Sequence, residues 1–415
     1  MDSHRMLSWR YTFVPIYAIS SALSVFISLY ILAIGGTVVD VGIAFSAYYA
    51  VSIPASLFFG YLMERLNMTK PFIMASAIAT LPILVAFLFP AGVYSAIAYY
   101  ALYSVAFTAA TPALNVLIMG TGAKARRSKM PRYYSKFGLF SILGFVAAMA
   151  FGLTIPRSDL VTYLAVMIAL DACAIAMVAL FIRDEPVGAF ARSKEQARRA
   201  FSMVNGLMHK GFLEYGLINK VRSMLRNKKK RSLYKLLFAI VLFNTGYYIF
   251  YASYVPFQIS FGLSYTDVFV IQLLNGLAQI AAFLVLLRMV RRPMLHRYFV
   301  TSSGLRGASY IIMAVSAFVP LGLMFSLNAF AYMVGGAVIA FWNLSSTVLL
   351  YHRIKGREEG YYLGLWSGLF GASAIAGSFA SGMLSYYAGY PSTFLAAALL
   401  TAASGIAFAV ELKEH

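Results

Sequence analysis

The chain has 415 residues, of which 61% are hydrophobic and only 12% are charged, and its formal net charge is +20 at pH 7. A soluble protein of this composition would expose large apolar patches and aggregate, so we exclude the soluble globular class and expect an integral membrane protein. The positive charge does not predict a nucleic-acid partner, because nearly all Lys and Arg residues lie on one side of the predicted membrane spans. The two exceptions are Arg157 and Arg306.

Twelve stretches of the chain are apolar and long enough to cross a bilayer, which takes about 20 helical residues. They predict an all-α integral membrane protein with twelve transmembrane helices. No small-residue cleavage site follows the first stretch, so we expect it to remain as the first helix. The predicted helices cover residues 11–34, 41–63, 71–90, 93–119, 134–154, 160–182, 235–258, 266–288, 298–318, 320–349, 360–386 and 392–411.

The distribution of Lys and Arg predicts the orientation of the chain. If the N-terminus is cytoplasmic, the connections after the even-numbered helices are cytoplasmic as well, and these connections hold the basic residues. The opposite connections are short and carry Asp40, Arg157, Asp159 and Asp267. Because cytoplasmic loops are enriched in Lys and Arg, we predict a multi-pass protein of the cell membrane with both termini in the cytoplasm.

The longest connection covers residues 183–234 and is rich in basic residues. Within it, Ser193 and Gln196 fit a capping box, and apolar residues then recur at helical spacing. We interpret this segment as an amphipathic helix on the cytoplasmic membrane face or under the helix bundle; a target for a binding partner is the alternative. The basic run at residues 228–231 is interpreted as a topology signal that also contacts anionic lipid headgroups.

Several short matches indicate that the chain repeats itself. Residues 137–141 (FGLFS) match residues 363–367 (LGLWS) about 226 positions later, and Asp40 and Asp267 fall in equivalent connections. A nearly constant offset with the same orientation predicts two related six-helix halves, an arrangement that supports alternating access to a site at the membrane midplane. The predicted division is 1–182 for the first half, 183–234 for the basic linker and 235–415 for the second half.

Residues 60–70 read GYLMERLNMTK and resemble the signature that members of the major facilitator superfamily carry between their second and third helices. Met68 departs from the signature, which has a basic residue there. The resemblance implies the family's fold of two pseudo-symmetric six-helix bundles, and it implies a secondary transporter. The positions that match, or that differ conservatively, are Gly60, Glu64, Arg65 and Lys70.

In the family, this connection helps to lock the cytoplasmic side while the protein is open to the outside. We therefore assign gating roles to Gly60, Glu64, Arg65 and Lys70. A glycine lets two helices approach closely, and a carboxylate can pair with a basic group or with a helix N-terminus. Contacts that form in one state only bias the equilibrium between states. The alternative is that these residues anchor a tight turn.

The resemblance also implies that helices 1, 4, 7 and 10 line the pathway, with helix 8 as a second contributor. Each of these helices carries polar residues on one face. Such faces line a wet cavity or join helices, and for a single serine the second role is the commoner one. We expect the Asn-Tyr-Tyr-Tyr face of helix 7 to line the cavity. The candidates for solute binding are Ser24, Tyr103, Thr108, Asn244, Tyr247, Tyr248, Tyr251, Gln272, Asn275, Asn328 and Tyr332.

No charged side chain lies in the interior of helices 1, 4, 7, 8, 10 or 11. A phosphate or dianion would need a basic clamp there, so we predict a neutral, polar, sugar-like solute. Export of lipophilic compounds is the first alternative, although helix 5 lacks the proline of the family's export signature. A membrane sensor that binds a solute without moving it is the second alternative.

Two charges lie inside other helices. Asp171 is near the middle of helix 6, where an ionised acid costs about 2.5–3.5 kcal/mol, and it is the candidate for proton coupling. A neutral, hydrogen-bonded acid between helices is the alternative. Arg306 lies in the cytoplasmic third of helix 9, and we expect its side chain to snorkel to the interface.

The sequence does not predict an enzyme. Its five His residues are scattered over cytoplasmic segments, so we expect no metal and no acid–base chemistry. No GxxxxGK[ST] loop is present, so we expect neither ATP hydrolysis nor a cofactor. The single cysteine, Cys173, excludes an internal disulfide. The expected partners are a small-molecule solute and the lipid bilayer, with no nucleic acid, and we expect a monomer.

Overall fold

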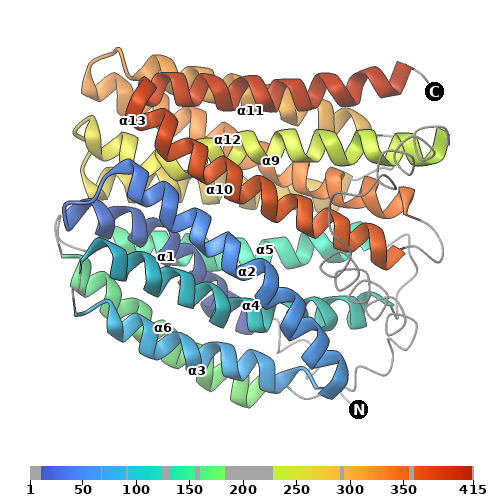
Figure 1. Ribbon diagram of the computed structural model, residues 1–415, viewed down its shortest axis with the longest axis horizontal. Helices are drawn as coiled ribbons and strands as arrows, with labels where there is room; N and C mark the ends of the chain where they lie inside the picture. The colour runs from blue at the N-terminus through green and yellow to red at the C-terminus, as the bar shows by residue number, and fades with distance from the viewer. Residues whose placement is uncertain are drawn as a thin grey trace, which may run out of the picture.

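The computed structural model describes residues 11–66, 68–89, 92–123, 130–154, 159–182, 228–289, 294–354 and 359–413. Within these ranges the protein is helical and contains no strand. The helices, shown in Figure 1, are α1 (Phe13–Ala33), α2 (Val38–Leu66), α3 (Lys70–Ala86), α4 (Val93–Ala123), α5 (Met130–Leu153), α6 (Leu160–Phe181), α9 (Lys228–Ser260), α10 (Tyr265–Met289), α11 (Leu295–Ser316), α12 (Leu321–Arg353) and α13 (Glu359–Lys413).

The last helix is two helices joined at a kink. Gly389 has φ 81° and ψ 162°, which no helix contains, and Pro391 follows it. Positive φ carries no Cβ penalty in glycine, so the chain reverses there without a longer loop. Counted as two segments, α13 makes the helices consistent with the twelve predicted spans. The predicted loop between 386 and 392 is therefore a kink.

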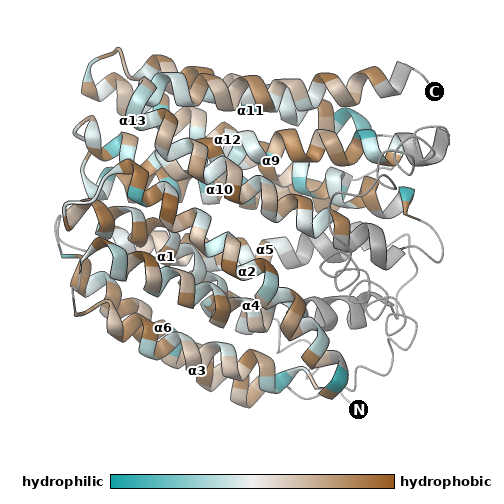
Figure 2. Cartoon of the chain, viewed as in Figure 1, coloured by the Kyte–Doolittle hydropathy of each residue, from teal (hydrophilic) through white to brown (hydrophobic). Residues whose placement is uncertain are grey.

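Eight helices of the described residues are long and apolar enough to cross a membrane by length and composition, and two shorter apolar helices accompany them. Figure 2 shows hydrophobic residues along the middle of the helices and the strongest hydrophilic colour near their ends. α11 is not among the eight. Its mean hydropathy is low because serines and Arg306 interrupt its apolar residues.

The helices form two bundles. In the first, α2 packs on α4, α3 on α4 and α6, and α1 on α5 and α6. In the second, α9 packs on α13, and α12 on α10 and α11. The halves meet where α2 contacts α13 and where α5 contacts α10 (Figure 1). The predicted linker, with its amphipathic helix, lies outside the described residues except for its last residues, which begin α9.

Equivalent caps open α2 and α10. The Thr37 hydroxyl donates to the Asp40 carboxylate at 2.8 Å, and the Ser264 hydroxyl donates to Asp267 at 2.6 Å. In both cases the carboxylate also accepts from the backbone N–H of the Thr or Ser. The turns before these caps contain Gly35 (φ 87°) and Gly262 (φ 92°). The same turn chemistry at the same place in each half supports the predicted repeat.

A third acidic cap opens α6. Asp159 accepts from the Thr162 backbone N–H at 3.0 Å and from the Thr162 hydroxyl. These bonds favour the carboxylate form, so the pKa of Asp159 lies below its usual value, and the Thr162 hydroxyl is the main cause. Asp40, Asp159 and Asp267 all begin helices at the left-hand end of Figure 1. We call this end the Asp end and the opposite one the basic end.

Glycines bring the two halves into backbone contact near the Asp end. A Cβ on Gly42 of α2 would lie 2.7 Å from the Ser378 carbonyl oxygen of α13, and a Cβ on Gly382 would lie 3.0 Å from the Val38 carbonyl oxygen. Between α5 and α10, a Cβ on Gly152 would lie 2.4 Å from the Phe269 ring. The halves are therefore closed against each other at the Asp end.

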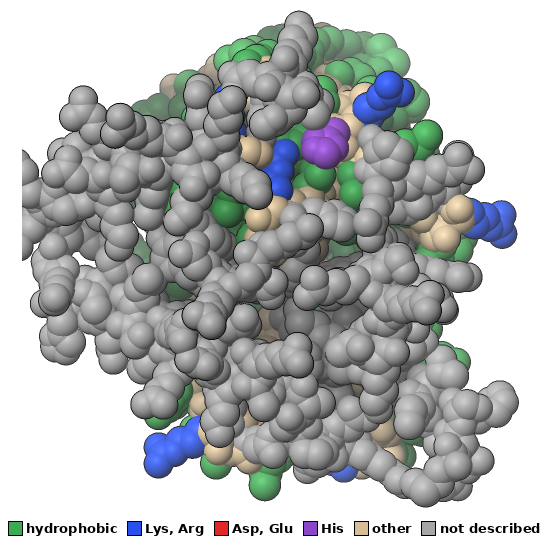
Figure 3. All heavy atoms as spheres, turned by 90° about the vertical axis from the view of Figure 1, so that its right-hand side faces the viewer, with side chains coloured by type: hydrophobic (Ala, Val, Ile, Leu, Met, Phe, Trp, Pro, Cys, Tyr) green, Lys and Arg blue, Asp and Glu red, His purple; other side chains and the backbone are tan. Residues whose placement is uncertain are grey.

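The basic end is arranged differently at α2. A Cβ on Gly60 would meet nothing within 4 Å, so this glycine makes no close helix contact in the present arrangement. Phe58 and Tyr61 are more than two-fifths exposed. Figure 3 looks onto this end, where the charged side chains visible among the described atoms are Lys, Arg and His.

Candidate solute-binding site

Tyrosines from both halves gather where α2, α4 and α9 meet. We call them the tyrosine cluster: Tyr48, Tyr49, Tyr100, Tyr103, Tyr247, Tyr248 and Tyr251. The ring centroids of Tyr48 and Tyr100 are 4.8 Å apart in the first half, and those of Tyr247 and Tyr251 are 5.6 Å apart in the second. These distances are typical of favourable aromatic pairs.

Contacts of the cluster cross from one half to the other. The rings of Tyr49 on α2 and Tyr248 on α9 lie 4.9 Å apart. The Tyr251 hydroxyl on α9 donates to the Ser24 hydroxyl on α1 at 2.9 Å. Ser24 in turn donates to the Ser21 carbonyl oxygen. The cluster therefore joins the halves through ring faces and hydroxyls, both of which a solute can replace.

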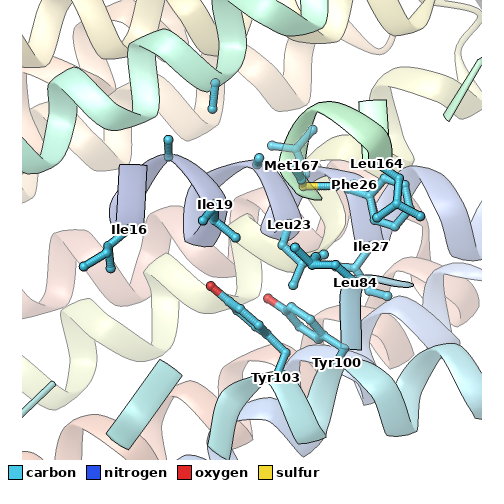
Figure 4. Close-up of a cluster of buried hydrophobic side chains, with 14 of the residues drawn as sticks. Ile16, Ile19, Leu23, Phe26, Ile27, Leu84, Tyr100, Tyr103, Leu164 and Met167 are labelled. Atoms are coloured by element: carbon cyan, nitrogen blue, oxygen red, sulfur yellow. The ribbon is translucent and has the colours of Figure 1, made fainter. Parts of the chain in front are cut away.

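Helix geometry accounts for how the cluster assembles. Tyr48 and Tyr49 are adjacent on α2 and so point in directions about 100° apart. Tyr48 consequently contacts Tyr100 within its own half, while Tyr49 contacts Tyr248 of the other half. On α4, Tyr100 and Tyr103 are three residues apart and share a face. Figure 4 shows the hydroxyls of this pair pointing toward α1.

Asn244 lies one turn before the tyrosines of α9. Its side chain is only 2% exposed, and its Nδ2 is buried without a hydrogen-bond partner among the described residues. A buried amide donor without a partner is costly unless water or a ligand satisfies it. This observation favours the predicted role of Asn244 in a wet site.

The structure brings some predicted site residues together. Ser24, Tyr103, Tyr247, Tyr248 and Tyr251 all belong to the cluster or contact it. Thr108 and Gln272 are buried on α4 and α10.

Two predicted asparagines join helices through their amides. Asn275 Nδ2 donates to the Tyr332 carbonyl oxygen at 2.7 Å and so joins α10 to α12. Asn328 Nδ2 donates to the Ser316 hydroxyl at 2.9 Å and joins α12 to α11. For these side chains, helix packing is the role that the geometry favours.

Tyr332 of α12 contacts Tyr254 of α9, which is not part of the tyrosine cluster. Its ring is 4.3 Å from that of Tyr254, and Tyr254 is fully buried on α9. Sequence reasoning missed Tyr48 and Tyr49, because the family resemblance directed attention to helices 1, 4, 7, 8 and 10 rather than to helix 2. The available signal was a pair of adjacent tyrosines in the middle of an apolar span.

Asp171 is buried in the first half with a 1% exposed side chain, and its Oδ2 has no hydrogen-bond partner among the described residues. It borders a small cavity of about 10 Å³, enough for about one water. Polar groups on α3 and α4 face the same space, namely Ser76, Thr80 and Tyr103. Proton coupling and a neutral, hydrogen-bonded acid between helices both remain predictions for Asp171.

Arg306 does not snorkel, and that prediction was wrong. Its side chain is 2% exposed, and its Nε donates to the Tyr310 hydroxyl at 2.9 Å. The guanidinium carbon lies 5.4 Å from the Tyr247 ring centroid, in cation–π range. The physical reason is that this face of α11 packs against the rest of its half, and Gly335 of α12 leaves room for the guanidinium.

The predicted gating residues lie at the basic end. Lys70 Nζ donates to the Ala179 carbonyl oxygen of α6 at 2.8 Å, a contact within the first half. Arg65 is exposed, and the side chain of Glu64 lies outside the described residues. With Gly60 making no close contact, gating remains a prediction. In the described ranges, no group of three His, Cys, Asp or Glu residues is placed to hold a metal ion.

Solved transporter structures share this fold. The crystal structure of the nucleoside transporter NupG has a TM-score of 0.69 at 13% identity, with 100% of each chain covered. A structure from work on proton-dependent oligopeptide transporters has a TM-score of 0.75 at 13% identity and covers 99% of each chain. The human organic anion transporter MFSD10 has a TM-score of 0.63 at 13% identity, covering 98% of this chain and 100% of its own. At these identities the likeness shows the fold alone.

None of the curated proteins compared with the chain matches it. A family model described as the Major Facilitator Superfamily matches residues 12–355, which include α1 to α6 and α9 to α12. The signature-like stretch at residues 60–70 and the two six-helix bundles agree with that match. The chain therefore belongs to the Major Facilitator Superfamily of secondary transporters.

Proposed function

We propose that the protein moves a small polar organic solute by alternating access, and that the tyrosine cluster binds this solute between the two halves. The observation that carries the proposal is the hydrogen bond from Tyr251 to Ser24, which links α9 to α1 across the halves. A solute bound at this position contacts both halves at once. Its binding therefore changes the free energy of moving one half against the other.

The solute needs a compact body that stacks on aromatic rings and groups that exchange hydrogen bonds with phenols. Both neutral, sugar-like compounds and planar polar compounds meet these requirements. The sequence-based preference for a neutral solute rested on the lack of a basic group near the pathway. Because the Arg306 guanidinium lies beside Tyr247, neutrality is no longer required.

Closure at the Asp end indicates how the cycle proceeds. The contacts of Gly42 and Gly382 hold α2 against α13, so these helices must separate before a solute can enter or leave at that end. Closure at the basic end would then depend on the segment that includes Glu64 and Arg65. This is the gating role that the family resemblance implies, and it remains part of the proposal.

The proposal is tested by solute uptake into proteoliposomes, after a thermal-shift panel of sugars, nucleosides, carboxylates and lipophilic cations has identified a ligand. Tyr251→Phe keeps the ring and removes the hydroxyl that reaches Ser24. We expect affinity to fall by about two- to tenfold, the value of one hydrogen bond. The matched control is Tyr387→Phe on α13, where the side chain is 76% exposed, and it should bind like the unaltered protein.

Three outcomes distinguish the alternatives. Saturable uptake that weakens in Tyr251→Phe supports the proposal. Hits confined to lipophilic compounds favour export. A ligand that binds saturably without being moved in either direction contradicts transport and favours a sensor.

A further inference from the structure

The buried Arg306 has no acidic partner among the described residues. Its only side-chain hydrogen bond there is from Nε to Tyr310, and its Nη1 is buried without a partner. The ionisable side chains beside it are the tyrosines Tyr247, Tyr310 and Tyr332, and none of them is a carboxylate. A guanidinium stays charged at every physiological pH, so it cannot avoid the cost of burial by losing a proton.

Aromatic rings enclose this charge. The guanidinium carbon lies 5.0 Å from the ring centroid of Tyr310, 5.4 Å from that of Tyr247 and 5.6 Å from that of Phe250. On the α12 side it rests against Gly335, where a Cβ would lie 2.1 Å from Nη1. Only a glycine leaves this space, so residues of α9, α11 and α12 together shape the arginine's surroundings.

These contacts do not fully satisfy the charge. A desolvated cation–π contact recovers only part of the free energy that removing an ion from water costs. Arginine has five N–H donors in a fork that matches a carboxylate. With one donor engaged by Tyr310 and Nη1 unsatisfied, the missing partner is an acceptor, and the strongest acceptor for a guanidinium is an anion.

Tyr247 connects this arginine to the tyrosine cluster. One contact of its ring is with the Arg306 guanidinium, and another is with the ring of Tyr251, 5.6 Å away. Tyr251 reaches Ser24 of the other half. Tyr247 itself is only partly buried. A solute that displaces the Tyr247 ring can therefore place one end at Arg306 and the other among the tyrosines.

We propose that Arg306 is the anion-binding group of the solute site and that the transported class is small organic monoanions, of which monocarboxylates are the simplest. This inference rests on the proposed function and narrows its substrate class. One guanidinium matches one carboxylate. In the described parts of helices α1, α4, α9, α10 and α12, no second basic group lies in the membrane interior to serve a dianion.

A packing role for Arg306 is the competing explanation, because the cation–π contacts alone could hold α9, α11 and α12 together. The two roles differ in their effect on a pair of ligands that match in shape and differ in charge. If Arg306 only packs helices together, its substitution changes the affinities for an anion and for its neutral analogue equally. If Arg306 binds the anion, its substitution weakens the affinity for the anion alone.

The experiment measures thermal shift and proteoliposome uptake with benzoate, phenylacetate and 4-hydroxyphenylacetate, each paired with its neutral amide. We expect saturable shifts for the carboxylates. The affinity for each amide should be at least about tenfold weaker, which is the value of a charged hydrogen bond. In Arg306→Gln the carboxylate affinity should fall to that of the amide, and Arg306→Lys should retain part of it. Arg297→Gln removes the same charge from an exposed position on α11 and should change nothing.

A second pair of variants guards against unfolding of Arg306→Gln. Gly335→Ala keeps the arginine and displaces its guanidinium, so it should weaken carboxylate binding while amide binding persists. Its control is Gly322→Ala on the same helix, where an added Cβ would meet nothing within 4 Å.

Equal affinity for carboxylates and amides, no saturable shift with any carboxylate, or full carboxylate affinity in Arg306→Gln would each overturn the inference. Uptake of a neutral solute that responds to Tyr251→Phe would then leave the proposed function standing. If the unaltered protein transports none of the tested solutes, the result counts against the proposed function itself.

Discussion

At the scale of single residues, tyrosine gives the cluster a ring face and a hydroxyl in one side chain. Tyr251 uses both, because its ring stacks on Tyr247 while its hydroxyl bonds to Ser24. The sequence predicted this face of α9 from its spacing. It did not predict that Tyr49 of α2 would meet Tyr248, because that contact depends on how closely the two bundles approach.

Asp171 is the residue on which proton coupling can be tested. Asp171→Asn keeps the size of the side chain and removes its ability to ionise. If Asp171 couples transport to protons, uptake driven by a pH gradient should fall by about tenfold while solute exchange without a gradient persists. Among the described residues bordering the Asp171 cavity, Tyr103 is the other titratable side chain.

The matched control for this prediction is Asp159→Asn. It changes a partly exposed acid at the start of the same helix, and asparagine serves equally well as an N-cap. Identical pH-driven uptake in the two variants would remove Asp171 from the coupling mechanism.

At the scale of elements, the contact between α2 and α13 helps to close the two halves against each other at the Asp end in this structure. Gly42 and Gly382 allow the two backbones to touch, which larger residues would prevent. The family signature directs attention to Gly60, yet in this arrangement the close approach occurs near the other end of α2. A sequence pattern identifies a glycine but does not show in which conformational state that glycine permits a close helix contact.

Gly42→Ala should open the Asp end, because its Cβ would lie 2.7 Å from the Ser378 carbonyl oxygen. Overpacking of this kind destabilises the contact by about 1–3 kcal/mol. Spin labels at the exposed positions Tyr94 of α4 and Tyr387 of α13 report the separation of the halves near this end. We expect a longer distance in Gly42→Ala than in the parent.

Gly60→Ala is the control, since an added Cβ there meets nothing within 4 Å. It should leave the label distance unchanged. An equal response of the two variants would show that the Gly42 contact does not hold the halves closed.

At the scale of the whole molecule, charge separates the two ends. Helices begin with Asp40, Asp159 and Asp267 at one end, and Arg65, Arg288 and Arg297 lie at the other. Because loops rich in Lys and Arg stay in the cytoplasm, we expect the basic end to face inward.

Cysteine labelling on intact cells tests this orientation. In a Cys173→Ser background, a membrane-impermeant maleimide should label Tyr94→Cys at the Asp end and leave Arg297→Cys at the basic end unlabelled. Disruption of the cells should expose both positions. The reverse pattern in intact cells would show that the orientation is inverted.

The sequence by itself determined the membrane class and the approximate extent of the helices, because both follow from local composition, and the stretch at residues 60–70 indicated the family by resemblance. The polar face of α9 follows from helical periodicity. Only the tertiary structure decided that Arg306 is buried beside Tyr247 and that α2 contributes to the site. A side chain's solvation depends on the helices packed around it, and those neighbours are distant in sequence: Gly335 makes room for Arg306, and Tyr248 meets Tyr49 from the opposite half.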